Sequence, residues 1–226
     1  MANINSINSK SEPLASTAIT IDSASGDDSY VQFNINTTNE FRLGVDATDD
    51  DFKIANGGAL GTTDYFIMDG SGQLRLPYNP AFSAYLSATQ SNVTGSSSYT
   101  IPFNTELYDI GSNFNTSTGI FTAPVDGKYM LSTSVNYKID VTGGTQVANR
   151  IFTSNRNYDS FFLPSSNRSV GYYGVSSQVD IIMTIIADMD ASDTAYILFT
   201  SDGGSDVDDI IGGSAGASFF MGYLLN

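Results

Sequence analysis

Apolar and polar residues alternate in the first third of the chain. The stretches 31–35 and 41–45 read VQFNI and FRLGV, with an apolar residue at every second position. A period of two residues places alternate side chains on one face of an extended strand. We therefore expect β-strands and no helix in this region.

Three shorter apolar pieces follow, at 52–54, 65–68 and 74–76. The turn-forming stretches NTTN, DATDDD, NGGALGTTD and DGSG lie between the successive members of these five apolar stretches. This pattern predicts a meander of about five short strands that ends near Pro77 and Pro80. Such a sheet has little apolar surface, so we expect it to pack against copies of itself or against the next domain.

Beyond Pro80, large aromatic residues are separated by polar turns. Such anchors favour two sheets whose inner faces meet in a sandwich, and they stand at Phe103, Phe114, Phe121 and Tyr129. Gly127 belongs to the turn VDGK, where glycine readily takes a positive φ.

One later stretch fits two secondary structures. Ile182, Ile185, Ile186 and Met189 have the offsets of one helix face. However, the surrounding VDIIMTIIADM is rich in β-branched residues, which favour strands. We predict a strand that is buried on both faces.

The composition agrees with an all-β protein. The 226 residues are 41% hydrophobic and include 14 Phe and 13 Tyr, but no Trp, Cys or His. Without His and Cys, the chain has no disulfide, no thiol or imidazole chemistry and no ordinary zinc site. It has only 3 Glu, and its 21 Asp lie mostly in turns, which disfavours a catalytic carboxylate pair. We expect no enzymatic activity and no cofactor.

The chain is strongly acidic, with a net charge of −15, which disfavours binding to nucleic acid or to anionic membranes. Residues 81–168 are balanced in charge, whereas residues 169–226 carry 8 acidic and no basic side chains. The stretch SDGGSDVDDI, residues 201–210, offers oxygen ligands for a hard cation but lacks the spacing of an ordered calcium loop. A calcium site and a solvated hairpin loop both stay open here, and no metal ligand is assigned.

Residues 1–20 are polar, lack strand alternation and contain Pro13. They have no signal-peptide pattern, and no later stretch has the length of a membrane span. We expect residues 1–20 to be an anchoring arm, and the protein to be made in the cytoplasm without inserting into a membrane.

Residues 41–74 carry the blocks LGVD, DFKI and LGT. In these blocks the segment resembles a module of tailed-phage tail fibres and tailspikes, where it lies between an anchoring end and a distal head. The resemblance implies that residues 21–80 are a fibre-like module.

A second resemblance begins after Pro80. Six aligned positions resemble the signature of the C1q-like domain, a relative of the tumour-necrosis-factor jelly roll: Phe103, Asp109, Phe114, Phe121, Gly127 and Tyr129. Leu131 and Thr133 depart from the signature, because the family prefers aromatic residues there.

The end of the chain extends this likeness. FFMGYLLN, residues 219–226, resembles the closing strand of the family, with Gly222, Leu224 and Leu225 in the expected order. MDASDTAYILFT, residues 189–200, resembles its penultimate turn and strand. The likeness therefore covers 81–226 and implies a C1q/TNF-like jelly-roll sandwich that assembles as a homotrimer.

The two resemblances together imply a structural protein of a phage virion. The chain lacks cysteines and Gly-X-Y repeats, so the secreted collagenous animal proteins match poorly. We expect a tail fibre or receptor-binding protein that contacts other virion proteins through its N-terminal region. A capsid decoration or head-fibre trimer is the alternative, and a cellular binding module or a glycan hydrolase is the third choice.

The stretch 149–173 is rich in aromatic residues, Asn and Arg, which bind polar surfaces well. A trimer would repeat it three times, so that weak contacts add through avidity. The candidate binding residues are Arg150, Arg156, Tyr158 and Arg168, and the expected ligand is a host cell-surface glycan or protein. Alternatively, the arginines pair with aspartates or line the subunit interface.

Overall fold

The computed structural model describes residues 21–35, 39–94, 98–138, 146–162, 178–202 and 207–225. Within these ranges every regular element is a β-strand, which confirms the all-β prediction. No helix in them is long and apolar enough to span a membrane. The expected anchoring arm, residues 1–20, lies outside the described residues. The chain divides into two units, Met1–Pro77 and Tyr78–Asn226.

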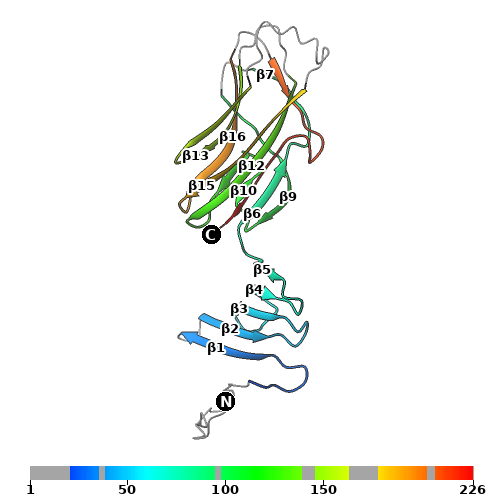
Figure 1. Ribbon diagram of the computed structural model, residues 1–226, viewed down its shortest axis with the longest axis vertical. Coiled ribbons are helices and arrows are strands. Elements are labelled where there is room, and N and C mark those ends of the chain that lie inside the picture. Colours follow the sequence, from blue (N-terminus) through cyan, green and yellow to red (C-terminus); the bar gives the residue numbers. More distant parts are fainter. Residues whose placement is uncertain are drawn as a thin grey trace. The chain divides into compact units, whose positions relative to one another are not determined.

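The first unit is an antiparallel meander whose strands pair in chain order (Figure 1). This confirms the predicted meander. Its strands are β1 (Ser29–Ile35), β2 (Asn39–Val45), β3 (Phe52–Asn56), β4 (Asp64–Met68) and β5 (Leu74–Arg75).

The two faces of the meander differ in chemistry. The register aligns Val31 with Leu43, Leu43 with Ile54, and Ile54 with Phe66, so these apolar side chains share one face. The opposite face carries charged residues, and its Lys53 is buried. The described part of the unit therefore buries its polar face more deeply than its apolar face.

The second unit contains two larger antiparallel sheets. Six strands form one sheet in the order β10-β11-β16-β13-β14, with β8 also paired to β16. Their bounds are β8 (Tyr99–Thr100), β10 (Phe114–Asn115), β11 (Ile120–Thr122), β13 (Gln146–Thr153), β14 (Asn157–Phe162) and β16 (Thr194–Asp202).

Seven strands form the other sheet in the order β7-β17-β12-β18-β6-β9, with β15 paired to β12. Their bounds are β6 (Ala81–Tyr85), β7 (Gln90–Thr94), β9 (Thr105–Ile110), β12 (Gly127–Lys138), β15 (Gln178–Met189), β17 (Val207–Ile210) and β18 (Phe219–Leu224). The sheets overlap as two layers in Figure 1.

The core of this unit lies between the sheets and is aromatic. The ring of Phe82, from β6, stacks on Phe114 and Phe121 of the other sheet at centroid distances of 4.9 and 4.6 Å. Phe220 of β18 meets the Phe82 ring edge-on at 4.9 Å. Offset and edge-on ring pairs stabilise beyond their area of contact. The predicted sandwich with an aromatic core is confirmed.

Strand β15 settles the helix-or-strand ambiguity in favour of a strand. The prediction that it is buried on both faces was wrong for the single chain. Ile181 and Ala187 are buried, whereas Ile182 and Ile186 are 67% and 60% exposed. Sheet alternation explains this difference, because only every second side chain reaches the core.

Candidate functional site

The aromatic residues of the sequence signature lie in the jelly-roll core. Phe103, Phe114, Phe121 and Tyr129 are all buried. Leu224 is partly buried and packs against the same core. Gly127 is the first residue of β12 and pairs with Met189, so it belongs to the strand rather than to the preceding turn. The four buried aromatic side chains therefore shape the fold and are not available to a ligand.

Gly222 is required by close packing. A Cβ atom there would lie 2.7 Å from Leu131 Cδ2 and 2.8 Å from Phe82 Cε1. Both neighbours are fully buried, so they have little room to move. Glycine therefore lets β18 pass between two core side chains.

Two polar members of the signature hold turns. The carboxylate of Asp109 accepts hydrogen bonds from the backbone N–H groups of Asn113 (3.0 Å) and Phe114 (2.9 Å). The hydroxyl of Tyr129 donates to the carbonyl oxygen of Val125 at 2.8 Å. Burial raises the pKa of Tyr129, so this donor keeps its proton over the ordinary pH range.

The predicted binding stretch forms the β13–β14 hairpin as far as Phe162. Arg150 lies opposite Asp159 in the register, and its Nε is 2.8 Å from Asp159 Oδ1. Both side chains are partly exposed. Arg150 thus has an acidic partner within its own hairpin, as the alternative interpretation of the arginines expected.

The other candidates in this stretch differ in their surroundings. Arg156 is exposed in the turn between β13 and β14. Two hydrogen bonds close this turn: Thr153 Oγ1 donates to the Arg156 carbonyl oxygen at 2.8 Å, and Arg156 N donates to Thr153 Oγ1 at 3.0 Å. Tyr158 lies opposite Ile151 and packs against the core, so only part of its side chain reaches the surface. Arg168 lies outside the described residues. A binding role for these residues stays a prediction.

The acidic stretch 201–210 is described only in part. The Asp209 carboxylate accepts a hydrogen bond from the Asn92 backbone at 3.0 Å and lies 3.5 Å from Lys138 Nζ. Nothing is described of the side chains of Asp202, Asp206 and Asp208. Across the described ranges, no group of three or more carboxylates has a geometry that could hold a metal ion.

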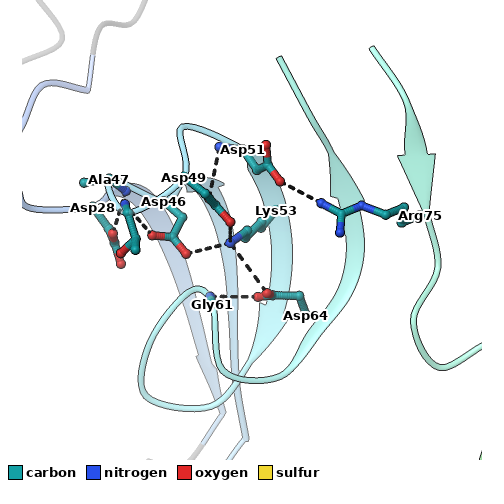
Figure 2. A network of polar contacts seen from close by, with 10 residues as sticks. Asp28, Asp46, Ala47, Asp49, Asp51, Lys53, Gly61, Asp64 and Arg75 are labelled. Carbon is teal, nitrogen blue, oxygen red and sulfur yellow. Dashed lines mark hydrogen bonds and ion pairs between the residues drawn. The ribbon is translucent and has the colours of Figure 1, made fainter. Parts of the chain in front are cut away.

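The meander contains a buried ionic network on its polar face (Figure 2). Lys53 Nζ lies 2.7 Å from Asp46 Oδ2, 2.7 Å from Asp49 Oδ2 and 3.8 Å from Asp64 Oδ2. The side chains of Lys53 and Asp46 are each only 4% exposed. The ammonium group thus occupies the space that a cation would need among these carboxylates.

Backbone donors complete the network. Asp46 Oδ1 accepts a hydrogen bond from Thr48 N at 2.8 Å, and Asp64 Oδ1 accepts one from Gly61 N at 3.0 Å. Burial by itself lowers the pKa of Lys53, but hydrogen bonds to Asp46 and Asp49 outweigh burial and raise it. The pKa of Asp46 is lowered, chiefly by its hydrogen bonds with Lys53 and the Thr48 backbone.

The outer side of the β15-containing sheet is uncharged over its central part. Its register aligns three rows of outward-facing residues across β15, β12, β18, β6 and β9. We call them the neutral face: Ile186, Met130, Tyr223, Ala81 and Ile110; Thr184, Ser132, Met221, Ser83 and Tyr108; Ile182, Ser134, Phe219, Tyr85 and Thr105. None of these side chains carries a charge.

Charged residues lie beside the first and the last of these rows. Lys128 and Asp188 form an ion pair at 3.6 Å next to the first row. Asp180 accepts a hydrogen bond from Asn136 at 2.7 Å next to the last row. The chain has a net charge of −15, so an area without charged side chains stands out from the rest of its sequence. Such an area is typical of an interaction surface.

Comparison with known families bears on the second unit. The C1q domain matches residues 81–225, which include both sheets. The chain belongs to the C1q domain family. A comparison with curated proteins finds no match.

Solved structures of the C1q and tumour-necrosis-factor type are similar to the C1q domain of this chain. The globular domain of zebrafish complement 1qA is 18% identical, with a TM-score of 0.46, over 65% of this chain and 98% of that one. Murine APRIL is 11% identical, with a TM-score of 0.45, over 65% and 99%. Eiger TNF from S. frugiperda is 13% identical, with a TM-score of 0.42, over 65% and 91%.

The C1q domain accommodates the two departures from the family signature. Leu131 and Thr133 are both fully buried. The Thr133 hydroxyl donates to the carbonyl oxygen of Phe219 at 2.8 Å, so the smaller, polar side chain is satisfied inside the sheet.

Sequence reasoning missed the Lys53 network and the neutral face. The segment 41–74 was interpreted as strands and polar turns, although Lys53 is the only basic residue among the aspartates of DATDDDFK. The blocks LGVD, DFKI and LGT contain Asp46, Lys53 and Gly61, which all take part in the network or contact it. This segment lies outside the C1q match.

Proposed function

We propose that this chain is a non-enzymatic homotrimer whose C1q domain serves as a binding or structural head. Domains of this family commonly form homotrimers. The observation that supports the trimer most strongly is the neutral face. Ile182 and Ile186 expose most of their surface in the single chain, although they belong to a twelve-residue strand that pairs with β12 along its whole length.

The charge distribution favours a contact between the neutral face and identical copies of this chain. Near a rotational symmetry axis each residue meets its own copies, so a charged side chain there repels itself. The chain carries 24 acidic residues, yet none lies within the three rows. Burial of isoleucine and aromatic side chains then drives assembly.

Substitution on the neutral face tests the trimer. Ile182→Asp places three carboxylates near one axis and should shift the protein from trimer to monomer in sedimentation velocity. Val125→Asp is the matched control, because Val125 is also exposed but lies in the turn before β12. A variant Ile182→Asp that stays trimeric at micromolar concentration would place the interface elsewhere.

We further propose that the trimer is a virion protein of a tailed phage and acts as its receptor-binding tail fibre. Support comes from the fibre-like blocks in 41–74 and from the C1q domain as a distal head. In this assignment the N-terminal region attaches to other virion proteins. Its copy number in purified particles tests the position, since a tail fibre is present in few copies and a shell decoration in hundreds.

Arg156 is the preferred ligand contact of this receptor-binding head. It is exposed at the tip of the β13–β14 hairpin, whereas Arg150 pairs with Asp159. Particles with Arg156→Ala should assemble normally and adsorb to host cells more slowly, while Lys128→Ala, another exposed basic site, should adsorb normally. Unchanged adsorption of both variants would favour the decoration role.

A further inference from the structure

The meander presents an apolar face that its own described residues cover only in part. The register places apolar residues from each of its five strands on this side. We call them the meander face: Val31, Phe33, Phe41, Leu43, Val45, Phe52, Ile54, Phe66, Met68 and Leu74. Within the unit, Phe33 is 57% and Leu74 63% exposed.

This exposure is unusual for a sheet of this composition. An antiparallel sheet with one apolar and one polar face ordinarily buries the apolar one. Here the polar face is covered instead, since Arg42 and Lys53 are buried and Leu60 from the β3–β4 loop is 5% exposed. Phe33 and Phe41 remain as an adjacent exposed pair of large rings.

We propose that the meander face is a second, independent interface at which three copies of this chain pack their sheets around one axis. The proposal rests on the proposed trimer and extends it to a part of the chain outside the C1q domain. Each sheet then buries its apolar side against the other two, and the charged network around Lys53 faces outward.

The charge distribution favours this face as the contact between identical copies. Residues 21–77 carry 3 basic and 10 acidic side chains, a net charge of −7, so two such units repel each other at most orientations. The meander face contains no charged residue. It is the side on which identical acidic units can meet at the least electrostatic cost.

The connection between the units favours the same occupant. Only residues 76–80 separate β5 from β6, and Pro77 and Pro80 stiffen this segment. Five residues span at most about 18 Å. A trimer of C1q domains therefore holds three meanders at a high effective concentration, which makes even a modest apolar contact favourable.

Cysteine crosslinking of the full chain tests the proposal, because the protein has no cysteine of its own. Leu43→Cys places a thiol in the middle of the meander face, and Asn34→Cys places one on the opposite side of β1. With a short bismaleimide at low protein concentration, Leu43→Cys should give covalent dimers and trimers. Asn34→Cys should give none, and a maleimide-polyethylene glycol should label it much faster than Leu43→Cys.

A double substitution on the meander face provides a second test of the interface. The double variant Phe33→Ser, Phe41→Ser should lower hydrogen-exchange protection of the meander strands by about tenfold or more, because it removes two rings that the proposed interface buries. Asn34→Ser should leave protection unchanged.

The outcomes separate this proposal from the trimer on which it rests. A wild-type trimer in which Leu43→Cys is labelled as fast as Asn34→Cys overturns the meander interface and leaves the C1q trimer standing. A trimer in which Leu43→Cys is protected but never crosslinks also overturns it, because the chain then covers its own face. A wild-type monomer overturns both.

Discussion

Lys53 and Asp46 form a buried ion pair, with 2.7 Å between Nζ and Oδ2, inside a sheet of only five strands. Removing one partner of such a pair leaves an uncompensated charge, which costs about 3–5 kcal/mol. We expect Lys53→Met to lower hydrogen-exchange protection across β2, β3 and β4 accordingly. The control Arg75→Met removes the partly exposed pair with Asp51 and should cost at most about 1 kcal/mol. Equal losses in both variants would contradict the role of Lys53.

The network also predicts how the meander responds to pH. The pKa of Asp46 is lowered, so its contribution to stability is present above its unfolded pKa of about 3.9 and is lost as the pH falls through its folded value. The pKa of Lys53 is raised, so its contribution is fully present below its unfolded pKa of about 10.4 and is lost as the pH rises through its folded value.

Protection factors of the meander strands should therefore be constant from about pH 5 to pH 10 and fall below about pH 4. They are measured by hydrogen exchange, with correction for the intrinsic rate at each pH. Asp46→Asn should weaken the acid dependence. An unchanged acid dependence in this variant would show that other groups cause it.

Gly61 should tolerate no side chain. Its φ of +79° costs a residue with a Cβ about 1–2 kcal/mol, and that Cβ would also lie 2.5 Å from Asp46 Oδ2. We expect Gly61→Ala to reduce protection of the meander. Gly58→Ala, which has open space around it, should be close to neutral. A neutral Gly61→Ala would mean that the loop holds Asp46 in a different position.

The core of the C1q domain should depend on Phe121 and Tyr129. Truncating either buried ring to Ala should destabilise this domain by about 3–5 kcal/mol in denaturant unfolding. Tyr129→Phe removes only the hydrogen bond to Val125 and should cost about 0.5–1.5 kcal/mol. Val125→Ala, at an exposed site, should change stability by less than about 0.5 kcal/mol.

The sequence predicted strands well where the alternation was strict. The stretches 31–35 and 41–45 became β1 and β2, and the β-branched residues of β15 outweighed its helix-like spacing. The expectation that β15 is buried on both faces failed for the single chain, because apolar residues on both sides of a strand do not reveal which side faces the core.

The polar contacts were harder to predict. Asp46 and Asp49 lie in the turn before Lys53, but Asp64 begins β4, and only the folded hairpins bring it to the same ammonium group. A run of aspartates is ordinarily a solvated turn. The single Lys53 within that run was the available signal. Strand alternation in β3 places it on the face opposite Phe52 and Ile54 but does not predict that this face is the buried one.

The central claim is that this chain works as a homotrimer, and its mass in solution tests this claim most directly. Multi-angle light scattering on the purified full chain at micromolar concentration should give close to three times the chain mass of 24.1 kDa. A mass that stays near that of one chain as the concentration rises would contradict the trimer and leave the neutral face without its proposed cover.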